Sequence, residues 1–382
     1  MREIGPSITR RGAVLGICAA VLAQPGQLWG ADPVRIGQIA PLSGGGAASG
    51  PSHVNGARLA LDMINAAGGV LSRSVELVVE DGLSTSEGAV AAFGRLTGRG
   101  DVVAVIGSTR SVEMHALAPE ALKIRYPLLF GGTDPALTQL DNPWLFRCQP
   151  NDLYSARAMA AFGVGELSRR NWAILHSSDP FGTSGAAALR AALQELDARV
   201  ALARDYPNQR GDFAALARAV SASDADVLAS YVSFEPDQVA MARALREAGV
   251  RLPWIGSQFI AATAVVAQAG EALFGTHAVA AFHPDANPHA RAFADRYDRV
   301  FGARADFFAA WPFDAVTILA RAMNSSGSTE PGALRRAILA IRGHGGAEGE
   351  FNFDNKGDGL HGYNVVRNDG GRVVFVRRFE FQ

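Results

Sequence analysis

Cysteine and lysine are almost absent from this sequence. Among 382 residues there are two cysteines, Cys18 and Cys148, and two lysines, Lys123 and Lys356. Cys18 lies in an N-terminal segment that export would remove, so Cys148 is left alone and cannot form an internal disulfide. The neighbouring sequence supplies neither the histidine nor the electropositive surroundings that a nucleophilic cysteine needs, and we therefore expect a buried, unreactive thiol.

The chain also has no excess of charge of either sign. Its formal net charge is −1, and 19% of its residues are charged. A near-neutral chain has no electrostatic footprint for nucleic acid or an anionic membrane, so we expect neither partner. Its length and its 48% content of hydrophobic residues are typical of a soluble globular protein with two cores.

The N-terminal apolar run is too short to span a bilayer. It covers residues 12–23, follows the basic segment Thr9-Arg10-Arg11 and precedes small residues. This pattern predicts a signal peptide over residues 1–31 and a periplasmic protein. The paired arginines leave a twin-arginine route open. A lipoprotein site at Cys18 is the weaker interpretation, because Ile17 stands where a small residue is preferred.

Common enzyme motifs are missing. We find no Gly-x-Ser-x-Gly elbow, no His-Glu-x-x-His and no phosphate loop ending in Gly-Lys-Ser/Thr. The glycine-rich stretch at residues 43–50 lacks that lysine, and we interpret it as a loop whose backbone must approach another group closely. His277, His283 and His289 follow no helix or strand period. We expect no catalytic residue, no metal and no cofactor.

Apolar strand-like runs alternate with helical patterns along the rest of the chain. Strands are expected within residues 34–44, 75–82, 102–107, 126–132, 171–182, 200–207, 225–232 and 253–258. This alternation predicts βαβ units and parallel sheets, and the nearly continuous apolar runs indicate sheets that are covered on both faces. The pattern restarts near residue 148 without a flexible linker, and it ends in a hairpin at "NDGG". The sequence therefore predicts an α/β protein with two lobes.

Three polar loops follow strands of the first half, at residues 41–50, 107–111 and 131–137. The carboxyl ends of parallel strands meet at one sheet edge, where ligands bind. Ser111 stands at a helix start, where free N–H groups favour an anion. Gly131 and Gly132 allow close approach of the backbone, and Thr133 adds a hydroxyl group. Together the loops suggest a cradle for a carboxylate; the alternative is that Ser and Thr only cap helices.

Two phenylalanines follow strands of the second half. Phe181 in "DPFG" and Phe234 in "SFEP" would be exposed apolar residues on loops. They either pack beneath their loops or close over an apolar or aromatic ligand.

At these residues the sequence resembles the periplasmic leucine/isoleucine/valine-binding proteins of ABC importers. The likeness covers roughly residues 33–382 and is carried by "IGQIAPLSG", "NGARLALDMINAAGGV", "VAVIGSTRS", "YPLLFGGTDPAL", "AILHSSDPFG" and "FDAVTILARAM". It implies the two-lobed type I periplasmic binding protein fold, with parallel-sheet sandwiches joined by a three-crossing hinge that closes on a ligand. The implied limits are 33–148 plus 283–352 for lobe 1 and 149–282 plus 353–382 for lobe 2.

The resemblance also implies roles for individual residues. Ser111 stands where the family binds the ligand carboxylate, and Gly131, Gly132 and Thr133 stand where that grip is completed. Phe181 and Phe234 replace tyrosines that close over the ligand, Ser49 stands where another aromatic is often found, and Phe308 and Trp311 lie near the side-chain pocket. The candidate ligand-binding residues are Ser49, Arg110, Ser111, Gly131, Gly132, Thr133, Phe181, Phe234, Gln258 and Phe308.

Gln258 is the most informative departure from the family. It stands where amino-acid binders carry the carboxylate that pairs with the ligand ammonium, and burying an ammonium group against a neutral amide is costly. Either Glu235 or Asp179 substitutes, or the ligand has no ammonium group. The alternative is that Gln258 is a loop residue that faces solvent.

We therefore expect a monomeric, extracytoplasmic solute-binding protein that delivers a small carboxylate, either an apolar or aromatic acid or an amino-acid-like compound, to an ABC permease. One alternative is a branched-chain amino-acid-binding protein. A second is a ligand-sensing module for a signalling partner, and a third is a hydrolase with Ser111 as its nucleophile.

Overall fold

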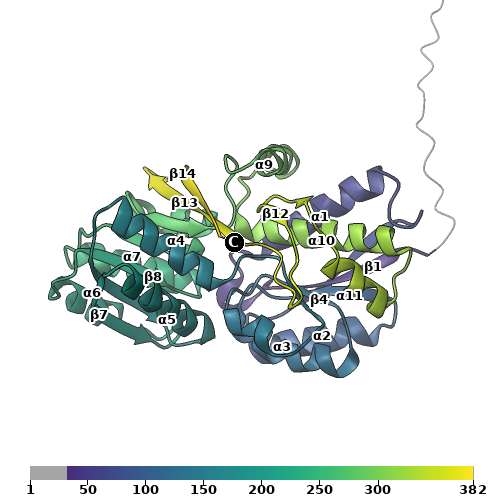
Figure 1. The fold of residues 1–382 in the computed structure, drawn as a ribbon, viewed down its shortest axis with the longest axis horizontal. Coiled ribbons are helices and arrows are strands. Elements are labelled where there is room, and N and C mark those ends of the chain that lie inside the picture. Colours follow the sequence, from purple (N-terminus) through teal and green to yellow (C-terminus); the bar gives the residue numbers. More distant parts are fainter. Residues whose placement is uncertain (1–31, 382) are drawn as a thin grey trace, which may run out of the picture.

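The computed structural model describes residues 32–381. The expected signal peptide and Cys18 lie outside the described residues. Two large sheets organise the rest of the chain, and they stand side by side in Figure 1.

The first sheet has five parallel strands in the order β2-β1-β3-β4-β5. Their bounds are β1 Val34–Ala40, β2 Val75–Asp81, β3 Val102–Ile106, β4 Leu128–Phe130 and β5 Leu145–Arg147. β3, the central strand, is apolar at every residue, which places side chains on both of its faces in a core. Val105 packs with α2 and α3, whereas Ala104 and Ile106 belong to the core beneath α1 and α10. The predicted covering of both faces is confirmed.

The second sheet has seven strands in the order β14-β13-β10-β9-β8-β6-β7. Their bounds are β6 Asn171–Ser177, β7 Arg199–Tyr206, β8 Val227–Tyr231, β9 Trp254–Gly256, β10 His277–Ala280, β13 Gly362–Asp369 and β14 Arg372–Glu380. The first five in chain order are parallel, and the hairpin of β13 and β14 adds antiparallel strands at one edge. The turn of this hairpin is at Gly370 and Gly371, as the "NDGG" motif predicts.

Eleven α-helices of the described residues surround the sheets. Their bounds are α1 Gly50–Ala66, α2 Ser86–Gly98, α3 Ser111–Ile124, α4 Asp152–Gly165, α5 Pro180–Glu195, α6 Phe213–Ser221, α7 Glu235–Glu247, α8 Thr263–Ala269, α9 Pro288–Phe301, α10 Phe307–Ser326 and α11 Pro331–Leu339. Short 3-10 helices form at η1 Gly44–Gly46, η2 Pro135–Gln139, η3 Gln258–Ala261 and η4 Gly270–Leu273, and β11 His344–Gly345 pairs with β12 Glu350–Phe351.

The chain passes between the two sheets three times. The first crossing follows β5, the second follows β10, and the third lies between β12 and β13. In Figure 1 these segments meet between the teal lobe and the purple and blue lobe. The three crossings are what the resemblance implies for the fold.

Within residues 32–381, no helix has the length and apolar character needed to cross a bilayer. The same residues contain no group of three or more metal-ligating side chains. Cys148 is buried and free, and burial raises the pKa of its thiol well above the usual value. The expectation of a buried Cys148 is confirmed.

The packing of α1 against α10 depends on a residue without a side chain. A Cβ atom added at Gly56 would lie 1.9 Å from the carbonyl oxygen of Ala309, whereas one added at Gly94 on α2 would meet nothing within 4 Å. Gly56→Ala should lower the free energy of unfolding by about 1–3 kcal/mol because the helices must separate. Gly94→Ala, the matched control, should raise it by up to about 1 kcal/mol. Urea unfolding measures both, and equal stability of the two variants would contradict this packing.

Candidate ligand-binding site between the lobes

The loops after β3 and β4 are fastened to each other at the start of α3. The N–H of Arg110 donates to Ser108 Oγ at 2.9 Å, and the N–H of Gly131 donates to the Ser108 carbonyl at 3.0 Å. A Cβ on Gly132 would lie 3.4 Å from Ser111 Cα, so the two backbones are neighbours. The predicted convergence of these two loops is therefore present.

Several hydrogen-bond donors converge where these loops meet. Ser111 Oγ accepts from the N–H of Asp134 at 3.1 Å, so its hydroxyl hydrogen remains free to donate elsewhere. The first N–H groups of α3 have no intrahelical partner, as in any α-helix. The N–H groups of Gly132 and Thr133 donate to no acceptor among the described residues. This set of donors suits an anion.

The Thr133 hydroxyl group is used differently from the expectation. It donates to Asp152 Oδ2 at 2.7 Å, and the Asp152 N–H returns a hydrogen bond to the Thr133 carbonyl at 2.9 Å. Burial raises the pKa of Asp152 to about 7. Thr133 therefore contributes its N–H to the cradle, while its hydroxyl fastens the loop to the start of α4.

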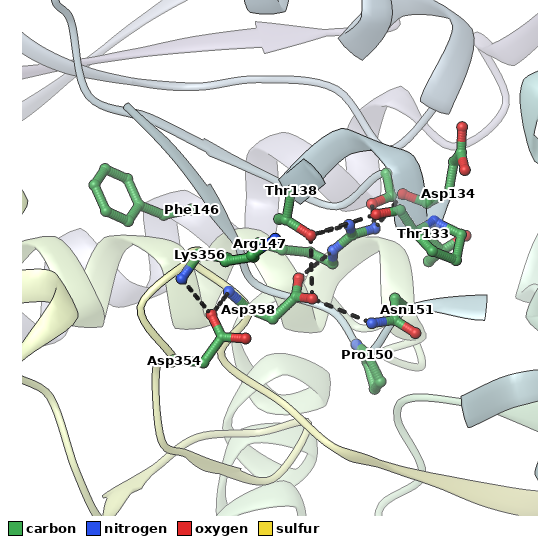
Figure 2. Close-up of polar contacts among 12 residues, drawn as sticks. Thr133, Asp134, Thr138, Phe146, Arg147, Pro150, Asn151, Asp354, Lys356 and Asp358 are labelled. Carbon is green, nitrogen blue, oxygen red and sulfur yellow. Dashed lines mark hydrogen bonds and ion pairs between the residues drawn. The ribbon is translucent and has the colours of Figure 1, made fainter. Parts of the chain in front are cut away.

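A buried arginine binds the carbonyl groups of the Gly132–Asp134 loop (Figure 2). Arg147 at the end of β5 donates through Nη1 to the carbonyls of Gly132 and Asp134, at 2.7 and 2.9 Å. Its Nε pairs with Asp358 Oδ1 at 2.6 Å, and its Nη2 donates to Thr138 Oγ1 at 3.2 Å. Because the Gly132 carbonyl points toward Arg147, the Thr133 N–H in the same planar peptide points away from it. Nothing in the residues around Arg147 predicts this role.

Asp358 also connects two of the crossings to the site. Its Oδ2 accepts from Asn151 Nδ2 at 3.1 Å, and Asn151 lies on the first crossing whereas Asp358 lies on the third (Figure 2). The N–H of Arg147 donates to the Gly357 carbonyl at 2.8 Å, so the segment before Asp358 extends the first sheet. The cradle and the hinge therefore share one buried polar network.

A second buried ion pair joins the two lobes directly. Arg110 Nη2 lies 2.9 Å from Glu235 Oε2, and the Arg110 guanidinium lies 4.7 Å from the centre of the Phe234 ring. A Cβ on Gly46 would lie 2.3 Å from Arg110 Nη2, and one on Gly45 would lie 2.9 Å from Phe234 Cδ1. The expectation that the glycine-rich loop approaches another group closely is confirmed, and the two lobes are in direct contact here.

Two further titratable groups lie near Arg110. Burial raises the pKa of Glu113, and the charge of Glu235 acts in the same direction. Burial lowers the pKa of His53 to about 3, and the charge of Arg110 lowers it further. His53 is therefore a neutral imidazole at physiological pH. Neither residue belongs to the set that the sequence predicted.

The prediction that Phe181 and Phe234 are exposed is wrong. Their relative exposures are 5% and 4%. Phe181 lies in the first turn of α5 and packs on the rings of Tyr231 and Phe259, at 5.7 and 5.4 Å between centroids. Phe234 is the N-cap of α7 and is covered by Arg110. Contact with the facing lobe buries Phe234, which the local sequence cannot show.

Aromatic rings form a continuous path from one lobe to the other. Phe259 of the second lobe lies 5.7 Å from Phe308 on α10, and Phe308 lies 4.9 Å from His53 on α1. His53 lies 5.8 Å from Trp311, whose ring would be 3.0 Å from a Cβ on Gly131. The path therefore reaches the backbone of the cradle. Phe308 and Trp311 were expected near the side-chain pocket from the sequence, whereas His53 and Phe259 were not.

Gln258 is buried, so the interpretation that it faces solvent is wrong. Its Nε2 donates to Gln149 Oε1 at 3.1 Å, and Gln149 Nε2 donates to Glu348 Oε1 at 2.9 Å. Both Asp179 carboxylate oxygens accept hydrogen bonds within the second lobe, from the N–H of Gly182 and from Asn208 among others. Burial raises the pKa of Glu348, and Gln258 is joined to this carboxyl group through the Gln149 amide.

Ser49 does not make the contacts expected of a residue that lines a ligand pocket, and Ser111 does not make those expected of a catalytic nucleophile. Ser49 is buried, and its Oγ donates to the Gly46 carbonyl at 2.9 Å within its own loop. His115 lies one turn after Ser111 and bonds the Asp134 carboxylate at 2.7 Å. Among the described residues, Ser111 Oγ makes no hydrogen bond to a histidine.

Hydrogen-bond donors suited to an anion converge where the two lobes meet. This arrangement defines a protein that holds a ligand between its lobes. The family model described as periplasmic binding protein matches residues 33–372, and the chain belongs to this family.

Individual relatives agree with this assignment. An amino acid binding protein of Pseudomonas aeruginosa is 26% identical over 332 residues, which are 85% of this chain and 87% of that protein. A leucine-binding protein, LivK, of Thermotoga maritima has a TM-score of 0.85 at 25% identity, covering 91% of this chain and 99% of that one. A solute-binding protein of R. palustris in complex with benzoate has a TM-score of 0.82 at 18% identity, covering 91% and 96%. The two-lobed fold implied by the resemblance is confirmed.

The Arg110–Glu235 pair generates a prediction about closure. Removing one partner leaves a buried, uncompensated charge, which reaches water only if the lobes separate. Arg110→Met and Glu235→Gln should therefore each increase the radius of gyration in small-angle X-ray scattering of the ligand-free protein.

The double variant has neither charge of the pair and should return toward the radius of the parent. Arg35→Met, which breaks an exposed ion pair with Glu76, is the matched control and should leave the radius unchanged. Unchanged scattering of both single variants would contradict a closing role for the pair.

Proposed function

We propose that this protein is the extracytoplasmic solute-binding component of an ABC importer and that it captures a small apolar or aromatic carboxylate between its lobes. The ligand carboxylate accepts hydrogen bonds from the Ser111 hydroxyl and from the N–H groups of Gly132 and Thr133. Closure then brings the second lobe over the ligand, and the closed form is recognised by the permease.

The observation that carries this proposal is the arrangement of the cradle. Its donors have no acceptor among the described residues, and it lies against the aromatic path through Trp311 and Phe308. Donors at one end and apolar rings at the other match an anion with an apolar body. The fold is compatible with such a ligand, since the R. palustris neighbour binds benzoate.

The surroundings of Gln258 favour a ligand without an ammonium group. The amide itself is neutral and bonds Gln149. Of the two acids that could substitute, Asp179 is occupied as the N-cap of α5, and Glu235 is paired with Arg110. An ammonium group placed against Gln258 would meet a neutral amide, and burying it there would cost roughly several kcal/mol.

A second candidate function is branched-chain amino-acid binding. The specific observation in its favour is that Glu235 Oε1 is buried and finds no hydrogen-bond partner among the described residues. In this alternative Glu235 holds the ligand ammonium while its other oxygen stays on Arg110. The leucine-binding relative from T. maritima supports the same alternative.

The remaining expectations form part of the proposal. The protein is a monomer, and it is exported through the signal peptide at residues 1–31 by a general or twin-arginine route. It has no catalytic activity, because Ser111 Oγ bonds no histidine within residues 32–381 that could act as its base. Lobe 1 comprises residues 33–148 and 283–352, and lobe 2 comprises residues 149–282 and 353–382. The third crossing begins beside the first sheet, because Asp358 pairs with Arg147 at the end of β5.

Calorimetry with benzoate, 4-methylvalerate and leucine tests the proposed ligand class. Benzoate or 4-methylvalerate, which has the leucine skeleton without its ammonium group, should bind more tightly than leucine. Tight binding of leucine with no binding of either acid would contradict the preference and support the amino-acid alternative. No binding of any of the three would contradict the proposed ligand classes altogether.

Ser111→Ala tests the anchor of the carboxylate. Loss of a hydroxyl that donates to a buried carboxylate should weaken binding by about 1–3 kcal/mol, measured by calorimetry with the acid that binds the parent. Ser223→Ala, at the end of α6 and far from the cradle, is the matched control and should leave the affinity unchanged. An unaltered affinity of Ser111→Ala would remove Ser111 from the site.

A further inference from the structure

His53 is a buried polar side chain that the contacts within the protein leave unexplained. Its relative exposure is 2%, and neither ring nitrogen has a hydrogen-bond partner among residues 32–381. A buried polar group without a partner costs free energy comparable to a lost hydrogen bond, so native proteins rarely retain one without a reason. The backbone of His53 is well fixed, since its carbonyl accepts from Gln38 Nε2 at 3.0 Å.

A second unpartnered group lies beside it. Trp311 is fully buried, and its Nε1 finds no acceptor among the described residues. The ring of Trp311 lies 5.8 Å from that of His53, and it also lies against Gly131 of the cradle. An indole N–H is a donor only, and in buried positions it usually finds a partner. The two unpartnered side chains therefore stand together, next to the cradle.

The remaining neighbours of His53 show that this place belongs to the space between the lobes. Phe308 lies 4.9 Å from the His53 ring and connects it to Phe259 of the facing lobe. Burial lowers the pKa of His53, and the charge of Arg110 is close enough to lower it further. His53 is thus bordered by groups that already contribute to the candidate site.

We propose that His53 and Trp311 form a polar subsite that recognises a hydroxyl group on the apolar body of the ligand. This inference rests on the proposed function and deepens it, because it narrows the ligand class from apolar or aromatic acids to hydroxylated ones. His53 and Trp311 are then specificity-determining residues, whereas Ser111 and its neighbouring N–H groups anchor the carboxylate.

The chemistry of the two side chains selects a hydroxyl group over other substituents. The neutral imidazole of His53 offers one donor and one acceptor, and Trp311 offers one donor. A hydroxyl group can donate to the acceptor nitrogen of the imidazole and accept from the indole N–H, so one ring nitrogen of His53 and the Trp311 N–H are satisfied at once. A carboxylate would lack the hydrogen that the imidazole acceptor needs, and an ammonium group would lack the acceptor that the indole needs.

The test compares benzoate with 3-hydroxybenzoate and 4-hydroxybenzoate by calorimetry, using the ratio of affinities within each variant. The parent protein should bind at least one hydroxybenzoate about tenfold more tightly than benzoate. His53→Phe should reduce that ratio to within about twofold of one, because the ring remains but its nitrogens are lost. His53→Gln retains a donor and an acceptor and should keep most of the preference.

His277→Phe is the matched control. His277 lies on β10 beside Phe162, outside the cradle, and its replacement should leave the ratio as in the parent. A parent protein that does not distinguish benzoate from either hydroxybenzoate, or a His53→Phe variant that keeps the preference, would overturn the subsite. If none of the three acids binds the parent, the proposed ligand class fails as well, and this outcome is distinct from equal binding of all three.

Discussion

The buried pair of Arg147 and Asp358 is the interaction on which the candidate site depends. A guanidinium group taken out of water is tolerated only when its donors find well-placed acceptors. Here Asp358, two backbone carbonyls and Thr138 supply them. The carbonyls belong to Gly132 and Asp134, so the acceptors that satisfy the arginine also fix the loop that carries the cradle. Because Asp358 simultaneously binds Asn151, the same network holds two of the three crossings. One buried hydrogen-bond network therefore fixes both the cradle loop and two of the segments that cross between the lobes.

This arrangement explains how lobe movement can leave the anchor unchanged. The donors proposed for the ligand carboxylate all lie on loops of the first sheet, which Ser108 and Arg147 fasten, and they need no contribution from the facing lobe. The second lobe supplies Glu235 to Arg110 and the ring of Phe259 to Phe308. In the proposed mechanism, closure makes and opening breaks these contacts, whereas the anchor is preformed. A preformed anchor lowers the ordering cost of binding, which favours capture by the open protein before closure.

The local pattern of the chain was sufficient to predict β1–β4 and β6–β9, the alternation of α and β elements, the terminal hairpin and the loops at the sheet edge, but it missed the short strands β5 and β10. These features follow from apolar periodicity and turn residues that lie within a few positions of each other. The rest depends on pairs that are remote in sequence. Arg147 and Asp358 are 211 residues apart, and nothing in either local segment marks them as partners. Phe234 is buried because Arg110 of the other lobe covers it. In the sequence His53 is only one residue of an amphipathic helix, and its contacts with Phe308 and Trp311 are visible only in the fold.

The position of the ligand carboxylate tests the account most directly. A crystal structure of the protein with the acid that binds most tightly would show it. The account predicts one carboxylate oxygen within hydrogen-bond distance of Ser111 Oγ and the other at the N–H groups of Gly132 and Thr133, with the Arg147 network intact behind them. A ligand whose carboxylate lies instead on the Arg110 guanidinium, with the Gly132–Thr133 N–H groups turned away, would contradict it.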